Sequence, residues 1–159
     1  MSTFTSLSEL KAIRLQLKAS GNKVVFTNGV FDLIHAGHVD YLSKAKASGD
    51  VLIVGLNTDE SVKRIKGHNR PILMQDERAF ILSNLKPVDY VIFFEEDTPE
   101  KLIMELLPDV LVKGADWQIE KIVGKDIVEK NGGEVKTIKF VSDQSTSRII
   151  ELILSRYSK

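Results

Sequence analysis

Five short runs of mostly apolar residues recur along the chain, and polar turn residues separate each run from apolar residues at helical spacing. Continuous apolar strands that alternate with helices are typical of a parallel sheet covered on both faces. We therefore predict an α/β fold, a Rossmann-like, doubly wound, five-stranded parallel sheet with helices on both faces. The predicted strands are Lys23–Thr27, Val51–Leu56, Tyr90–Phe94, Val110–Val112 and Val135–Phe140.

Capping residues and helix breakers mark the helices between these strands. Ser6 and Glu9 form a capping box for a helix that ends before Gly21. Another helix is predicted from about Ile119 to Asn131, where a glycine pair ends it. Residues 142–147 cap the last helix, which we expect to face inward with Ile149, Ile150, Leu152 and Ile153.

Composition narrows the functional classes. The 159 residues are 43% hydrophobic, which suits a single domain with an N-terminal helix (residues 1–21) and a core (residues 22–159). Lys+Arg and Asp+Glu are both 22, so no charge excess points to nucleic acid or an anionic membrane. The absence of cysteine excludes disulfides, thiolate metal sites and cysteine catalysis. Neither a signal peptide nor a membrane span is recognisable, so we expect a cytoplasmic protein.

The segment Thr27–His38 joins a predicted strand to a predicted helix. In an α/β sheet this crossing opens onto the edge where ligands bind, with free helix N–H groups facing them. His35 and His38 project from one side of the first helical turn, and Gly37 between them lets a ligand approach the backbone. Two imidazoles, bare backbone and the positive end of a helix predict a phosphate site.

Other signatures limit this interpretation. Neither Gly-x-Gly-x-x-Gly after the first strand nor a Gly-Lys-Ser/Thr P-loop is present, which disfavours an ordinary dinucleotide-binding protein or a P-loop NTPase. A zinc pair is the other functional interpretation of the two histidines. Its further ligands would have to come from His68 and carboxylates.

The same segment carries a family resemblance. Asn28–His38 resembles the signature of the cytidylyltransferase-like nucleotidyltransferase superfamily, whose hallmark is His-x-Gly-His. The similarity extends from about Lys23 to the C-terminus. It includes Val54–Ser61, Asp76–Arg78, Val112–Trp117 and Ser145–Ser147.

Within the superfamily, four further segments most resemble the ADP-heptose synthase branch. Its members are D-glycero-β-D-manno-heptose 1-phosphate adenylyltransferases, which act in lipopolysaccharide-core precursor synthesis. In many relatives this domain is fused to a sugar kinase, and no kinase is present in this sequence, so the resemblance implies a separate sugar kinase upstream in the pathway. ATP rather than CTP is implied by this branch alone. The segments are Phe26–Gly29, Arg70–Ile72, Phe94–Pro99 and Pro108–Gly114.

The resemblance implies a mechanism. An oxygen of a sugar 1-phosphate attacks the α-phosphorus of ATP, and pyrophosphate leaves. Because the attacking phosphate is already an anion, catalysis consists of positioning and charge stabilisation. An imidazole beside polyphosphate, with an ordinary pKa of about 6.5, should favour the cation. Mg²⁺ should accompany ATP, held mainly by its phosphates and water rather than by protein ligands.

The resemblance also assigns residues to roles. The expected catalytic residues are His35, His38 and Lys66, the last lying in a basic, turn-rich loop. The expected nucleotide-binding residues are Thr27, Asn28, Gly29, Phe31, Gly37, His38, Ser145, Thr146 and Ser147. The expected substrate-binding residues are Asp32, Asn57, Lys66, Arg70, Arg78, Lys113, Gly114, Asp116 and Trp117.

Several of these residues also have a structural interpretation. Asp32 could be a turn or cap residue, Arg78 could form a structural salt bridge, and Trp117 could belong to the core. Ser145–Ser147 suits a helix N-cap, and capping and anion binding can hold together. His68 more simply belongs to the surface.

Alternative functions remain open. The nearest is a cytidylyltransferase acting on glycerol 3-phosphate or another small phosphorylated alcohol. Those enzymes carry Arg-Thr-Glu-Gly-Ile-Ser-Thr-Thr where this chain has Phe140–Ser147, and the missing arginine favours the heptose branch. A non-catalytic nucleotide-binding domain would not need the clustered donors. A class I tRNA synthetase fragment would need a lysine-rich loop and an RNA-binding domain, and neither is evident. The superfamily resemblance also implies a homodimer.

Overall fold

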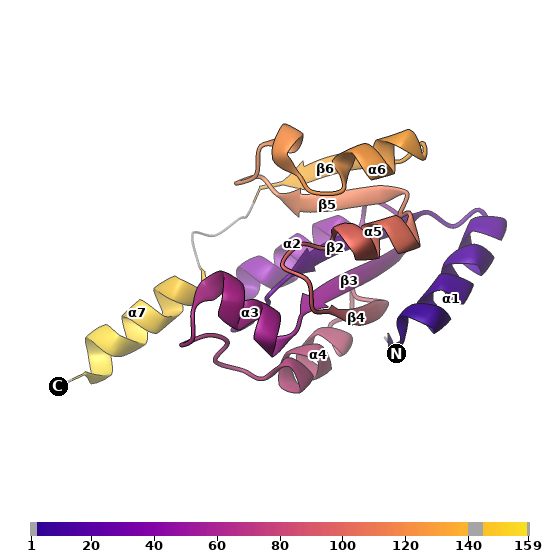
Figure 1. Cartoon of the computed structure of the whole chain (residues 1–159). Coiled ribbons are helices and arrows are strands. Elements are labelled where there is room, and N and C mark those ends of the chain that lie inside the picture. Colours follow the sequence, from indigo (N-terminus) through magenta and orange to yellow (C-terminus); the bar gives the residue numbers. More distant parts are fainter. Residues whose placement is uncertain (1–2, 140–144, 159) are drawn as a thin grey trace.

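A computed structural model describes residues 3–139 and 145–158 of the chain. Its centre is a sheet with the strand order β1-β4-β3-β2-β5-β6 (Figure 1). The five predicted strands are present and parallel, although Phe140 lies outside the described residues. A two-residue strand at the β4 edge, β1, was not predicted. The strands are β1 (Thr3–Phe4), β2 (Val24–Gly29), β3 (Val51–Asn57), β4 (Tyr90–Phe94), β5 (Val110–Gly114) and β6 (Glu134–Ile138).

Helices cover both faces of the sheet, as predicted. Leu42 of α2 and Leu82 of α4 are fully buried in the core on one face. Leu10 of α1, Ile103 of α5 and Val128 of α6 are fully buried in the core on the other face. The helices are α1 (Leu7–Ala19), α2 (Ala36–Lys46), α3 (Asp59–Lys66), α4 (Gln75–Ser83), α5 (Glu100–Leu106), α6 (Lys125–Lys130) and α7 (Thr146–Tyr157).

Two helix predictions can be compared with the structure in detail. The capping box of α1 is confirmed, because Ser6 Oγ accepts from the Glu9 N–H and the Glu9 carboxylate accepts from the Ser6 N–H. The single helix predicted from about Ile119 to Asn131 is wrong. A 3₁₀ turn (Ile119–Lys121) and α6 replace it, separated by Gly124. Gly124 has a φ of +89°, and a Cβ there would lie 2.5 Å from an α5 side chain, so the backbone turns where a helix cannot continue.

The sheet reverses its strand order between β2 and β5. From β2 the chain builds outward through β3 and β4, and then returns to place β5 on the other side of β2. These two central strands pair only over Val25–Phe26 and Val110–Leu111, so the ladder stops short of their carboxyl ends. In doubly wound sheets, ligands bind outside the carboxyl ends at this switch point.

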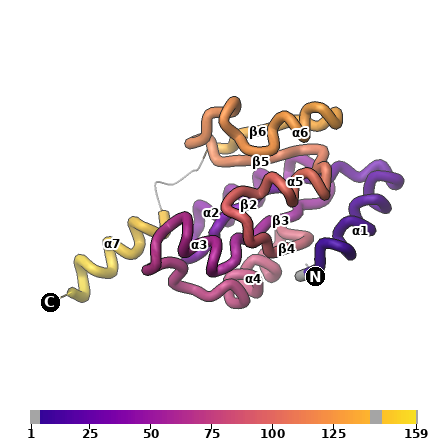
Figure 2. Tube along the Cα trace, viewed as in Figure 1, coloured from indigo at the N-terminus to yellow at the C-terminus, as the bar shows by residue number. Residues whose placement is uncertain are grey.

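The last helix, α7, packs differently from the others. Figures 1 and 2 show it projecting from the body of the molecule beyond α3, and none of its residues is buried. Leu152 and Ile153 are 46% and 48% exposed, so the prediction that they face inward is wrong. Ile149 and Ile150 are half-buried. The apolar spacing predicted the helix, but spacing cannot say what covers its apolar side.

Candidate functional site

The predicted crossing from β2 to α2 places the two histidines together. His35 is the N-cap residue of α2, and its carbonyl accepts from the His38 N–H at 2.9 Å. The two rings stack with centroids 3.9 Å apart, and the edge of Phe31 packs against His38 at 5.3 Å. The first turn of α2 therefore presents both imidazoles on one side, as predicted.

Neither histidine has satisfied its buried ring nitrogens. Nδ1 and Nε2 of His35, and Nδ1 of His38, are buried without a hydrogen-bond partner in the described part of the chain. Burial lowers the pKa of His35, while burial and then repulsion from His35 lower the pKa of His38 to about 4. Without a ligand both rings are thus neutral at pH 7. The cationic bias expected beside polyphosphate stays a prediction, since a polyanion would raise both pKa values.

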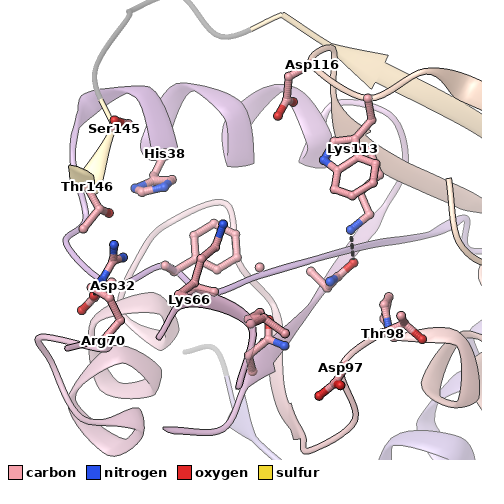
Figure 3. Close-up of a pocket in the computed structure, with 18 of the residues that line it drawn as sticks. Asp32, His38, Lys66, Arg70, Asp97, Thr98, Lys113, Asp116, Ser145 and Thr146 are labelled. Atoms are coloured by element: carbon pink, nitrogen blue, oxygen red, sulfur yellow. Dashed lines mark hydrogen bonds and ion pairs between the residues drawn. The ribbon is translucent and has the colours of Figure 1, made fainter. Parts of the chain in front are cut away.

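A cavity of about 640 Å³ opens at the carboxyl ends of the central strands (Figure 3). Its volume lies in the range typical of sites for small molecules. Most of the predicted site residues line it, although they come from segments far apart in the sequence. They are Asn28, Gly29, Phe31, Asp32, His38, Asn57, Lys66, Arg70, Lys113, Asp116, Trp117, Ser145, Thr146 and Ser147.

Some predicted site residues do not line this cavity. Thr27 is fully buried, and its hydroxyl shares a 2.7 Å hydrogen bond with Tyr41, which ties β2 to α2. Gly37 is buried within α2, and His35 lies behind His38. Gly114 lines a smaller adjoining cavity of about 150 Å³. These residues shape the site from outside the main cavity.

Asp32 lies in the wall of the cavity, but its carboxylate is already occupied. Its side chain is 0% exposed, and its oxygens accept from Arg70 Nε at 2.6 Å and from the backbone N–H groups of Ile72 and Leu73 at 2.9 Å. Burial alone would raise its pKa, but these hydrogen bonds more than compensate, so the pKa of Asp32 is lower than usual. This geometry favours the site-organising interpretation over a contact to substrate.

Arg78 is a structural residue. Its guanidinium is fully buried and donates to the carbonyls of Leu73 and Val30, at 3.0 and 2.7 Å. It also donates to the Asn57 carbonyl at 2.9 Å and to the Asp59 carboxylate at 2.7 Å. Since no donor faces the cavity, the prediction that Arg78 binds substrate is not supported, and its structural alternative is.

A second cluster lies at the end of β5. Lys113 donates to the Asn28 side-chain carbonyl, across the gap where β2 and β5 no longer pair, and lies 5.9 Å from the centre of the Trp117 ring. Burial lowers the pKa of Lys113 to about 8, opposed by the negative charge of Asp116. Trp117 is 49% exposed and is not a core residue. Lys113 therefore retains a positive charge at pH 7 on the cavity wall.

The remaining predicted residues come from α3 and α7. Lys66, the last residue of α3, is exposed at the cavity, and its side chain has no hydrogen bond or ion pair among the described residues. Ser145 is the N-cap of α7, with its hydroxyl accepting from the Arg148 N–H at 3.1 Å. It also lines the cavity, so capping and a ligand contact are compatible. His68 is exposed and lies outside the cavity lining, as expected of a surface residue.

Comparison with known proteins shows which family has this sequence and fold. A family model described as cytidylyltransferase-like matches residues 26–152, which is most of the chain. The chain belongs to the cytidylyltransferase-like family.

Curated relatives within this family share much of the sequence. The bifunctional protein HldE of Citrifermentans bemidjiense is 60% identical over 137 residues, which cover 86% of this chain and 28% of the relative. The bifunctional protein HldE of Geobacter sulfurreducens is 51% identical over 154 residues, covering 97% of this chain and 31% of the relative. The chain thus spans about three-tenths of the length of these relatives.

Solved structures of other proteins resemble this chain. A lipopolysaccharide core biosynthesis protein from Thermoplasma volcanium is 32% identical, with a TM-score of 0.63, covering 78% of this chain and 100% of that one. A pantoate-beta-alanine ligase from Francisella tularensis has the same TM-score at 15% identity, covering 92% of this chain and 69% of that one. The second likeness shows a shared fold alone.

Some cavity-lining residues were not predicted. Asp97, Thr98 and Pro99 follow β4 at the same sheet edge, so their position after a strand could have indicated them. Ile122 and Val123 come from the segment between the 3₁₀ turn and α6, which was predicted as helix. Nothing in their sequence pattern marks them as site residues.

The donor set at the cavity bears on metal binding. Among residues 3–139 and 145–158, no group of three or more His, Cys, Asp or Glu side chains could hold a metal ion, which disfavours a zinc site. The Asp32 oxygens already accept from three donors, and Asp97 pairs with Arg64. Asp116 is left as a single carboxylate. This donor set suits a metal ion that is carried by the ATP phosphates better than one held entirely by protein ligands.

No helix in the described part of the chain is long and apolar enough to cross a membrane.

Proposed function

We propose that the protein transfers AMP from ATP to D-glycero-β-D-manno-heptose 1-phosphate, giving ADP-heptose and pyrophosphate for lipopolysaccharide-core precursor synthesis. The observation that carries this proposal is the stacked histidine pair, whose buried nitrogens lack partners beside a cavity lined with cations. The 50–60% identity to HldE proteins supports the choice of substrates. The family's nucleotidyltransferase chemistry supports the reaction type.

The reaction requires little of the protein beyond placement and charge. An oxygen of the heptose phosphate forms a bond to the α-phosphorus, the bond from that phosphorus to the bridging oxygen breaks, and its electron pair leaves on pyrophosphate. The nucleophile is ionised, so no general base is required. Preorganised donors that meet the growing negative charge lower the barrier.

Residues on different walls of the cavity carry out different parts of this task. His38, with His35 behind it, donates N–H groups to the ATP phosphates at the positive end of α2. Lys66, as a mobile charge, and Arg70 bind phosphate oxygens on the α3 side. Asp116 and Trp117 hold the sugar or base at the end of β5, and Lys113 beside them contacts phosphate.

Three features complete the proposal. Mg²⁺ carried on the ATP phosphates would neutralise charge there, and Asp116, a cavity-lining carboxylate without a hydrogen bond or ion pair among the described residues, would be the side chain available to it. Residues 1–159 act as one nucleotidyltransferase domain in the cytoplasm, on heptose 1-phosphate that a sugar kinase supplies. The protein works as a homodimer, which the uncovered apolar residues of α7 support. Light scattering at micromolar concentration tests the dimer.

Pyrophosphate release tests the function directly. The purified protein with Mg²⁺ is assayed with ATP or CTP against heptose 1-phosphate or glycerol 3-phosphate, and a His38→Ala preparation controls for contaminating activity. Release with ATP and heptose 1-phosphate alone is expected. Release with CTP and glycerol 3-phosphate alone would keep the mechanism and overturn the substrates. Absence of pyrophosphate release with every combination of nucleotide and phosphorylated acceptor would overturn the proposal.

A further inference from the structure

Arg70 is attached to the cavity wall through one of its three guanidinium nitrogens. Its Nε donates to Asp32, and its side chain is only 15% exposed. Its two terminal nitrogens have no hydrogen-bond or ion-pair partner among the described residues, and the residue lines the cavity. Figure 3 shows Asp32 and Arg70 together on the side of the cavity that also carries His38 and Thr146.

The backbone beside Arg70 is fixed by the same carboxylate. Asp32 accepts from the N–H groups of Ile72 and Leu73, while the Leu73 carbonyl accepts from the buried Arg78. Both peptide groups of Leu73 are therefore held, whereas residues 67–69 just before Arg70 are exposed. The fixed segment and the Nε contact together restrict the rotamers of Arg70.

We propose that Asp32 is a positioning residue, which holds Arg70 by its Nε so that the two terminal nitrogens meet a phosphate group in the cavity. This inference rests on the proposed function, because it takes the cavity to be a phosphate site. An arginine held in this way can offer a two-pronged contact to phosphate oxygens without losing further rotamer freedom. Asp32 itself touches no substrate.

Direct contact by Asp32 is the competing interpretation. A carboxylate has about four acceptor positions, and here three donors converge on oxygens that have no exposed surface. A sugar hydroxyl or a metal ion would have to displace Arg70 or a backbone N–H. A purely structural role for Asp32 is the other alternative, and it predicts that Arg70 is irrelevant to phosphate binding.

Ligand binding can be followed without turnover, because Trp117 is the one tryptophan in the sequence and lines the cavity. Its fluorescence is titrated with ATP and, separately, with heptose 1-phosphate. The variants are Arg70→Ala, Arg70→Lys, Asp32→Asn and the Asp32→Asn/Arg70→Ala double variant. Arg64→Ala is the matched control, since that arginine also donates its Nε to an aspartate but lies outside the cavity lining.

We expect Arg70→Ala to weaken binding of at least one phosphate ligand about tenfold or more, and the ligand affected tells which phosphate Arg70 holds. Arg64→Ala should stay within about twofold. Methylguanidinium should restore binding to Arg70→Ala in a saturable way, because it can occupy the vacant place on Asp32. The double variant should not respond to it.

Equal rescue of the single and double variants would overturn the proposal, as would unchanged binding of both ligands by Arg70→Ala. If Asp32→Asn fails to fold, Arg70→Lys still decides: one ammonium cannot hold Asp32 and grip phosphate as a fork, so near-normal binding would contradict the proposal. Failure of the proposed function is distinguishable, because it would appear as absent turnover in the wild type while these titrations still report on Arg70.

Discussion

Two kinds of buried polar group lie in the wall of the cavity or directly behind it. His35 and His38 have buried ring nitrogens without hydrogen-bond partners. The Asp32 carboxylate and the Arg78 guanidinium, in contrast, form hydrogen bonds with neighbouring backbone and side chains. A buried polar group without a partner costs free energy, and a ligand that supplies the partner recovers it. The first pair is therefore prepared for a ligand, and the second pair holds the loops that surround it.

This difference separates two roles that a sequence motif combines. All four residues fall within segments that resemble the superfamily, and all four were assigned to the site. The structure gives the two pairs opposite relations to their neighbours, because only the second pair has hydrogen-bond partners for its buried polar atoms. Substitutions that change one pair and leave the other intact separate the two roles.

His38→Ala should affect turnover most. Removing a donor that meets the developing charge should lower kcat by about 10²–10³-fold, while ATP still binds measurably. The substitution also removes ring packing against His35 and Phe31 and a hydrogen bond with the Leu33 backbone, so the free energy of unfolding should fall by about 2 kcal/mol while the protein still folds. Steady-state kinetics and ATP titration measure this, with His68→Ala as an exposed histidine control. Unchanged turnover would contradict the role given to His38.

Arg78→Ala should affect stability most. It leaves the Asp59 carboxylate and three carbonyl groups without their donor, so unfolding free energy should fall by about 3–5 kcal/mol. Urea denaturation measures the loss. Arg64→Ala, which removes an exposed ion pair with Asp97, is the control and should leave the urea midpoint essentially unchanged. If the Arg78→Ala protein were as stable as the wild type but no longer bound substrate, Arg78 would be a binding residue and not a structural one.

Acid should weaken the fold through His38. Its pKa is about 4 when folded and about 6.5 when unfolded, so the unfolded chain binds more protons between these values and stability falls as pH falls. Between pH 7 and pH 5 this amounts to about 2 kcal/mol. Urea midpoints at the two pH values, compared with His38→Asn, isolate the contribution. An equal pH dependence in both proteins would show that His38 is not the group responsible.

Ser145→Ala should have the smallest effect. Loss of the N-cap should cost about 1 kcal/mol, confined to α7 because that helix has no buried residue. Hydrogen exchange of the first α7 amides should therefore accelerate several-fold while the urea midpoint stays unchanged. Ser155→Ala, later in the same helix, is the control. A lowered urea midpoint would mean that α7 is part of the cooperative core.

The sequence predicted the sheet because strand burial produces continuous apolar runs that are readable without tertiary information. It also predicted the histidine pair, since a strand-to-helix crossing places a helix N-terminus at the ligand edge. It could not tell that Arg78 points into loops rather than into the cavity, because an arginine looks the same in both settings. Gly124, where the helix breaks, depends on contact with α5, and Leu152 depends on what covers α7.

The placement of α7 has a consequence for affinity measurements. Its first residues line the cavity, yet none of its described side chains is more than half-buried, so little free energy binds it to the body. If only a fraction of molecules holds α7 at the cavity, the observed dissociation constant for nucleotide is the intrinsic one divided by that fraction. Anything that covers the apolar side of α7 would therefore tighten nucleotide binding without touching the nucleotide.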